Sequence, residues 1–169
     1  MSQLSEFRRA KDQFMAQDHD SPLTDEQRRG FRGLIYYDEN PDLRLKLDIE
    51  PFETQETVEI QTSTGSVAAF TRWGRLSFGV NGTPAHLTVY RDVESGGYFP
   101  PFADSTSGEE TYGAGRYLEI ETLPDGTSLE DFNYAYNPYC AYNEKWSCPL
   151  TPSENRLKVP IESGEKNFK

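Results

Sequence analysis

The chain has 169 residues and a formal net charge of −11, with 35% hydrophobic and 13% aromatic residues. This length is enough for one domain with a hydrophobic core, and the aromatic content predicts a globular protein instead of a disordered one. The negative charge disfavours nucleic acid and anionic membranes as partners, because their phosphates repel the protein.

The N-terminal sequence, MSQLSEFRRAKDQFM, lacks the apolar stretch of a signal peptide, and no apolar run reaches the length of a membrane span. We therefore expect a cytoplasmic protein with no membrane partner and with both cysteines reduced. The sequence assigns neither a cofactor nor an oligomeric state.

The first part of the chain has helical signals. Residues 3–17 carry a thin apolar stripe at helical spacing, which predicts an amphipathic helix. Thr24 followed by Gln27 is a capping-box pattern, so a short helix is predicted over residues 25–31. We expect residues 1–35 to form a helical segment packed on a β domain. The stripe consists of Leu4, Phe7, Ala10 and Phe14.

After Asn40 the apolar period changes from helical spacing to two. This alternation predicts a strand over residues 43–49 that ends at Pro51, and further strands follow over residues 58–60 and 67–71. The dipeptide Asn81-Gly82 then predicts a type I′ hairpin turn. The predicted cross-strand pairs are Phe78 with Ala85, Leu76 with Leu87, Ser77 with His86, Arg75 with Thr88 and Trp73 with Tyr90.

The segment ESGGYFPPFADSTSGEE, residues 94–110, is longer than most connections and rich in glycine, proline and serine. Two interpretations stay open. The segment is either a lid over a functional site or a packed surface loop whose aromatic residues cover the sheet.

A second hairpin is predicted around the sequence Leu123-Pro-Asp-Gly-Thr127, with Gly126 in the left-handed position of a three-residue loop. This register places Leu118 opposite Phe132. Alternation then defines an apolar core face and a polar face. The expected core face is Tyr112, Ala114, Leu118, Ile120, Phe132, Tyr134 and Tyr136, with Arg116 opposite Tyr134 and Ala114 opposite Tyr136. The polar face is Tyr117, Glu119, Asp131, Asn133 and Asn137, with Gly113 and Gly115 as bare patches.

Arg116 falls on the apolar face, where a charge is costly unless it is paired. Its partner is expected to be a carboxylate, an aromatic ring or a ligand anion. The polar face is either the wall of a ligand pocket or a solvated surface.

Helical signals first and short strands afterwards predict a mainly β (α+β) fold: an antiparallel β barrel or sandwich with an N-terminal helical cap. Residues 42–169 are expected to form the β domain within a single domain of residues 1–169. A parallel sheet is disfavoured because no crossover helices separate the strands.

Four segments resemble signatures of an uncharacterised bacterial and archaeal family, domain-of-unknown-function family 1684. They are SPLTDEQRRGFRGLIYY, FPPFADSTSGEETYGAGRYLEI, DFNYAYNPYCAYNEKWSCPL and PSENRLKVPIESGEK. The resemblance covers almost the whole chain. It implies neither an activity nor a catalytic residue.

The two cysteines, Cys140 and Cys148, match neither zinc-finger nor redox-motif spacing, so no metal site is predicted. The expected alternatives are small buried thiols or a loop-closing disulfide. A thiol or metal enzyme would need His86 as the base near one cysteine.

The leading hypothesis is a pocket in the β domain that binds a small polar or anionic ligand, with or without catalysis, and that is covered by residues 94–110. Arg116 would hold an anionic group, Asp131 would accept hydrogen bonds or protons, and the asparagines would orient the ligand. The rival hypothesis is a non-enzymatic interaction or scaffold module whose aromatic motif is structural. The predicted ligand-binding residues are Tyr112, Arg116, Tyr117, Asp131, Asn133, Asn137 and Cys140.

Overall fold

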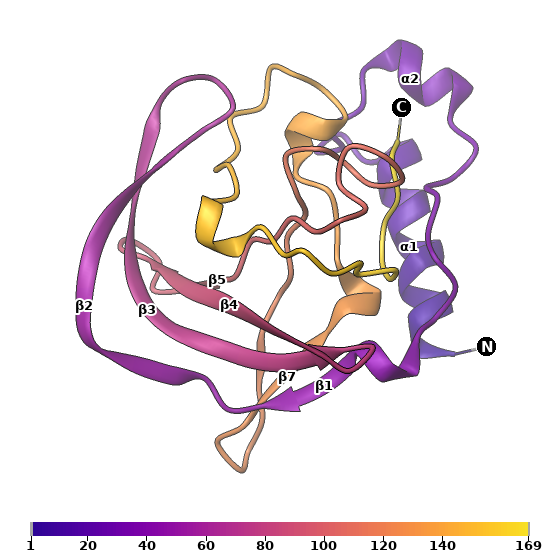
Figure 1. Cartoon of the computed structure of the whole chain (residues 1–169). Coiled ribbons are helices and arrows are strands. Elements are labelled where there is room, and N and C mark those ends of the chain that lie inside the picture. The colour runs from indigo at the N-terminus through magenta and orange to yellow at the C-terminus, as the bar shows by residue number, and fades with distance from the viewer. Residues whose placement is uncertain (1, 169) are drawn as a thin grey trace.

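The computed structural model describes residues 2–168 and shows a mainly β protein with an N-terminal helix (Figure 1). The described part of the chain forms two antiparallel sheets. The larger, with strand order β2-β3-β4-β5, curls as a half-barrel, and the smaller has the order β1-β7-β6. The predicted antiparallel, mainly β fold with helices at the N-terminus is confirmed. No helix within residues 2–168 has the length and apolar character needed to cross a membrane.

The helices follow the sequence signals. Helix α1 spans Gln3–Gln17 and α2 spans Asp25–Gly30. The capping box of α2 is formed, because the amide of Gln27 donates to Thr24 Oγ1 over 3.1 Å and the amide of Thr24 donates to Gln27 Oε1 over 2.8 Å. Helix α1 lies along one side of the molecule (Figure 1).

The larger sheet contains β2 (Glu50–Gln61), β3 (Val67–Val80), β4 (Thr83–Asp92) and β5 (Tyr98–Phe99). Four of the five predicted pairs across the β3–β4 hairpin are present. The positive φ angles of Asn81 (51°) and Gly82 (82°) are those that a type I′ turn requires.

The fifth predicted pair, Trp73 with Tyr90, is wrong. Arg72 is opposite Tyr90 and Gly74 is opposite Val89, which leaves Trp73 as the extra residue of a β-bulge. A Cβ atom at Gly74 would lie 2.7 Å from the carbonyl oxygen of Glu50 in β2, so only glycine permits this close approach of the two strands. Because the bulge shifts the alternation, Arg72 shares a sheet face with Tyr90.

Strand β2 also begins earlier than expected. The prediction that Pro51 ends the preceding strand is wrong, because Pro51 lies within β2, opposite Gly74 and beside an irregularity that extends to Glu56. Proline is tolerated here because β2 is an edge strand, where a missing amide donor breaks no ladder on the outer side.

The smaller sheet contains β1 (Arg44–Leu47), β6 (Glu121–Thr122) and β7 (Ser128–Asp131). The three-residue loop between β6 and β7 is confirmed, since Leu123 donates to the carbonyl of Thr127 over 2.8 Å and Gly126 has a φ of 88°. Within residues 2–168, four short 3-10 helices complete the fold. They are η1 (Pro41–Leu43), η2 (Phe132–Tyr134), η3 (Tyr139–Ala141) and η4 (Ser153–Asn155).

The second predicted hairpin is shorter than expected. Strand β7 pairs with β6 over two residue pairs, and on its other side all four of its residues pair with β1. The chain enters η2 directly after Asp131. The predicted register beyond this point is therefore wrong. Arg116 bridges Phe102 and Tyr117 bridges Tyr136, so the pairs of Leu118 with Phe132, Arg116 with Tyr134 and Ala114 with Tyr136 do not form.

The segment 94–110 packs into the molecule instead of forming a lid. Its Tyr98 and Phe99 form β5 beside β4, and Phe102 is fully buried. Phe102 belongs to the main hydrophobic core between the sheets, together with Leu43, Leu76, Val80, Ala85, Leu87, Val89, Leu118, Phe132, Ala135 and Ile161.

Glu130 in β7 is an exception among the buried side chains. It is opposite Leu45 of β1 and is fully buried, but neither carboxyl oxygen has a hydrogen-bond partner among the described residues. Burial raises the pKa of Glu130 to about 7, because no neighbouring group stabilises the charged form.

Candidate functional site

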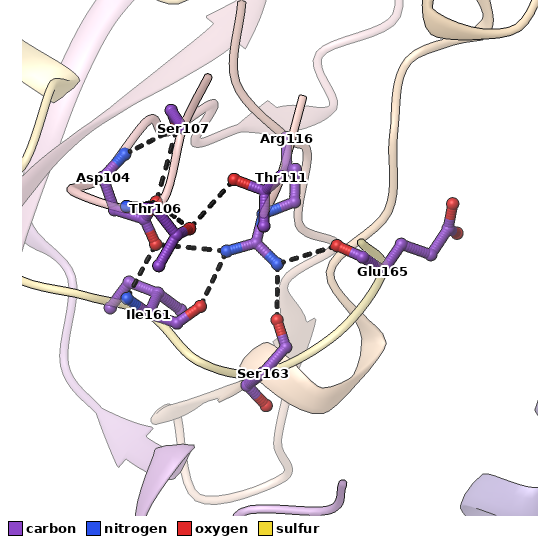
Figure 2. Close-up of polar contacts among 8 residues, drawn as sticks. All are labelled: Asp104, Thr106, Ser107, Thr111, Arg116, Ile161, Ser163 and Glu165. Atoms are coloured by element: carbon purple, nitrogen blue, oxygen red, sulfur yellow. Dashed lines mark hydrogen bonds and ion pairs between the residues drawn. The ribbon is translucent and has the colours of Figure 1, made fainter. Parts of the chain in front are cut away.

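Arg116 is buried, with 1% of its surface exposed, and is held by a carboxylate and backbone carbonyls (Figure 2). Its Nη2 lies 3.2 Å from Asp104 Oδ2 and donates to the carbonyl of Ile161 over 2.8 Å. Its Nη1 donates to the carbonyls of Ser163 and Glu165. Two of the three expected partners are therefore present: the carboxylate of Asp104 and the ring of Phe102, whose centroid lies 5.0 Å from the guanidinium carbon. The guanidinium joins the C-terminal segment to the core.

The two predicted asparagines are also buried within the fold. Asn133 Oδ1 accepts from the amide of Asn40 over 2.8 Å and from Ser163 Oγ over 2.7 Å. Asn137 Nδ2 donates to the carbonyl of Lys166 over 3.0 Å. Both side chains hold connecting segments in place, and neither lines one of the pockets described below.

Three of the predicted residues lie in one cluster, which contains the two thiols. They are Tyr112, Tyr117 and Cys140. The hydroxyl of Tyr112 is 3.6 Å from Cys140 Sγ, and the amide of Cys140 donates to Cys148 Sγ over 3.4 Å. The hydrogen bond from Cys148 is the main cause that lowers the pKa of Cys140, to about 6, although burial opposes it. The hydroxyl of Tyr117 donates to the carbonyl of Pro149 nearby.

His86 is remote from these thiols. Its Nδ1 lies 2.9 Å from Ser77 Oγ on the exposed face near the β3–β4 turn. The cysteines contact Ser63 in the β2–β3 turn, at the opposite end of β3. The arrangement that a Cys–His nucleophile requires is not formed by these residues.

Treatment with hydrogen peroxide is expected to join Cys140 and Cys148 in a disulfide. The two thiols lose two protons and two electrons, and the peroxide is reduced to water. The adjacent sulfurs and the acidified Cys140 favour this reaction over oxidation of a single thiol. Mass spectrometry should show the loss of two hydrogens in the parent, whereas a Cys148→Ser variant should keep Cys140 as a thiol or sulfenic acid. If both cysteines of the treated parent are still alkylated, this prediction is wrong.

Asp131 Oδ1 accepts hydrogen bonds from the amide and from Nδ2 of Asn133 over 3.0 and 2.8 Å, and Asp131 also lies in the wall of a groove between α1 and β7. The seven predicted residues are thus divided among a buried polar network, a thiol cluster and a groove. They do not surround one cavity.

A second pocket lies in the β domain itself, over the face of the larger sheet that carries Arg72 and Tyr90. Its volume is about 390 Å³, within the range of about 300–1,000 Å³ typical of small-molecule sites. The segment before and within η4 forms its other wall. The lining residues are Val58, Glu59, Ile60, Gln61, Arg72, Tyr90, Leu150, Thr151, Pro152 and Glu154.

Arg72 and Glu154 form the charged centre of this pocket. Arg72 Nε lies 3.1 and 3.2 Å from the two carboxylate oxygens of Glu154, and Nη2 lies 3.0 Å from Oε1. The guanidinium also stacks on Phe52, 4.2 Å from the ring centroid. Both side chains are about one-third exposed, so the pair is accessible from solvent.

Element η4 brings Glu154 to the sheet. The neighbouring Asn155 is fully buried and exchanges hydrogen bonds of 2.8 and 2.9 Å with the backbone of Thr88, which fixes η4 on the edge of β4. The hydroxyl of Thr88 donates to Glu154 Oε1. Two sequence segments 66 residues apart are thereby held together at the pocket.

The electrostatics keep the pair ionised. Burial opposes the charge on Glu154, but hydrogen bonds from Arg72 and Thr88 outweigh it and lower the pKa of the carboxyl. The hydrogen bond with Glu154 raises the pKa of Arg72. Burial, followed by the charge of Glu154, raises the pKa of Tyr90 far above neutrality, so Tyr90 is present as a neutral phenol. Thr151 adds a buried hydroxyl without a hydrogen-bond partner among residues 2–168.

The sequence did not indicate this pocket, because an uninterrupted hairpin register places Trp73 opposite Tyr90. The structure places Arg72 there instead. One signal was available: Gly74 lies in the middle of a strand, and glycine at such a position commonly marks a bulge.

These features define a mainly β protein with a ligand-sized pocket, charged at its centre, at the edge of a curled sheet. Residues 29–166 match the family described as "Protein of unknown function (DUF1684)", and the chain belongs to this family. It is similar to an uncharacterised protein of Haloarcula marismortui solved by solution NMR, at 38% identity and a TM-score of 0.72, over 97% of this chain and 92% of that one. No curated protein matches the chain.

Proposed function

We propose that the protein binds a small polar ligand with an acidic group in the pocket around Arg72 and Glu154. The observation that carries this proposal is that only part of the Arg72 guanidinium is hydrogen-bonded within the protein. The carboxylate of Glu154 pairs with Nε and Nη2 of Arg72, but Nη1 has no hydrogen-bond partner among the described residues. A guanidinium fixed on one edge and one face presents its remaining donors in a defined direction.

The other lining groups support a polar ligand. Tyr90 contributes a hydroxyl group, and Gln61 contributes an amide. Glu59 and Glu154 give the lining two negative charges against the single positive charge of Arg72. A ligand that carries both a carboxylate and an ammonium group satisfies this lining better than a simple anion, because each charged group then meets its opposite.

NMR titration with glutamate, succinate and inorganic phosphate tests the proposal. We expect glutamate to bind most tightly and to shift the amide resonances of Arg72, Tyr90 and Thr151. The Arg72→Gln variant should weaken glutamate binding about tenfold or more, as expected when a charge-assisted hydrogen bond is lost.

Arg75→Gln is the matched control, since Arg75 is exposed on the same strand and does not line the pocket. Arg72→Lys keeps the charge but loses the planar guanidinium, and we expect intermediate affinity. The proposal is overturned if none of the three compounds shifts the pocket resonances, or if Arg75→Gln weakens binding as much as Arg72→Gln.

A further inference from the structure

The groove between α1 and β7 is larger than the Arg72 pocket, with a volume of about 730 Å³. Three of the four residues of the α1 apolar stripe line this groove, namely Phe7, Ala10 and Phe14. The fourth residue, Leu4, is buried, whereas the side chain of Phe7 is 43% exposed and lies in the wall of the groove. The lining residues are Gln3, Phe7, Ala10, Lys11, Phe14, Arg44, Glu119, Ile120, Glu121, Leu129, Asp131, Tyr134, Tyr136 and Tyr139.

Five of these residues are aromatic, and contacts hold several of the rings in place. Phe7 packs edge-on against Tyr134 with 4.9 Å between the ring centroids, and Tyr139 packs against Trp146 at 5.2 Å. The ammonium of Lys11 lies 5.1 Å from the centroid of the Tyr136 ring. A cation on one ring face shows that the wall accommodates positive charge.

The charges of the lining are not balanced. Its two cations are already paired, Lys11 with Glu165 and Arg44 with Asp131. Glu119 accepts a hydrogen bond from the hydroxyl of Tyr136 over 2.5 Å. Neither Glu119 nor Glu121 has a cationic partner within residues 2–168, so negative charge remains at the rim of an aromatic groove.

We propose that this groove binds a small organic cation, an alkylated or quaternary ammonium compound with an apolar body. Aromatic faces attract such a cation, and the unpaired carboxylates add to the attraction. Quaternary ammonium groups suit the site because they are weakly hydrated and carry apolar methyl groups. The inference is independent of the proposed function, since it concerns a different cavity and a ligand of opposite charge.

Calorimetric titration with choline and with 3,3-dimethyl-1-butanol, its uncharged isostere, tests this inference. Both compounds have the same shape, so their difference in affinity measures the contribution of the charge. We expect choline to bind at least fivefold more tightly, which corresponds to about 1 kcal/mol of cation–π and electrostatic attraction.

Three variants locate the binding. Tyr134→Leu removes one ring and Glu119→Gln removes one charge, and each should weaken choline binding about threefold to fivefold. Glu53→Gln, at an exposed position of β2 outside the groove, is the control and should leave choline binding unchanged. Equal affinity for the two compounds, no measurable choline binding, or equal effects of Glu119→Gln and Glu53→Gln would each overturn the inference. Failure here leaves the Arg72 pocket unaffected, because its test uses other ligands and other variants.

Discussion

Replacing Arg116 with methionine is expected to lower the free energy of unfolding by about 3–5 kcal/mol, the cost of removing one partner of a buried ion pair. The substitution leaves Asp104 charged and buried, and it removes the donors that satisfy the carbonyls of Ile161, Ser163 and Glu165 (Figure 2). Urea denaturation followed by circular dichroism measures this loss. The C-terminal segment should also become accessible to protease, because Arg116 holds it against residues 104–116.

A double variant separates the two contributions. Adding Asp104→Asn to Arg116→Met removes the uncompensated charge, so about 1 kcal/mol or more of the lost stability should return. Arg75→Met is the control for an exposed arginine and should change stability by less than about 0.5 kcal/mol. A loss below about 1 kcal/mol for Arg116→Met would contradict the structural role assigned to this residue.

Replacing Glu130 with glutamine is expected to stabilise the protein at pH 8 by about 3 kcal/mol and to have little effect at pH 4.5. The carboxyl is buried without a partner, and its pKa is raised to about 7 in the folded state. Between the ordinary pKa of glutamate and pH 7, the folded protein therefore retains a proton that the unfolded chain releases. The contribution of Glu130 to stability is thus lost as the pH rises through this range and stays constant above it.

Denaturation curves at several values between pH 4.5 and pH 8 check this sign. The difference between Glu130→Gln and the parent should grow with pH and reach a plateau above pH 7. The exposed Glu53→Gln variant should differ from the parent by a small amount that does not change with pH. The prediction fails if the Glu130→Gln difference is constant over the range or decreases as the pH rises.

Local signals in the sequence predicted much of the fold. The capping box of α2, the Asn81-Gly82 turn and the three-residue loop at Gly126 all form as expected. Each depends on a few neighbouring residues, so the sequence alone determines it. The register beyond Asp131 was not predictable in this way, because β7 pairs with β1, a strand more than 80 positions earlier in the chain.

The candidate pocket was not predictable from the sequence either, because it also depends on contacts between segments far apart in the chain. Its ion pair joins Arg72 to Glu154, and only the tertiary fold brings η4 to the edge of β4. Sequence patterning correctly identified that Arg116 needs a partner, but it could not distinguish a carboxylate of the protein from that of a ligand. Asp104 supplies that carboxylate from the segment 94–110, whose packing the sequence left open.

The bulge at Trp73 divides β3 into two stretches that serve different purposes. Leu76 and Val80, on one side, belong to the main core that joins the sheets, whereas Phe70 and Arg72, on the other, belong to a smaller cluster and the pocket. A substitution of Arg72 therefore changes the lining of the pocket without touching the main core, whereas a substitution of Phe70 disturbs the smaller cluster alone.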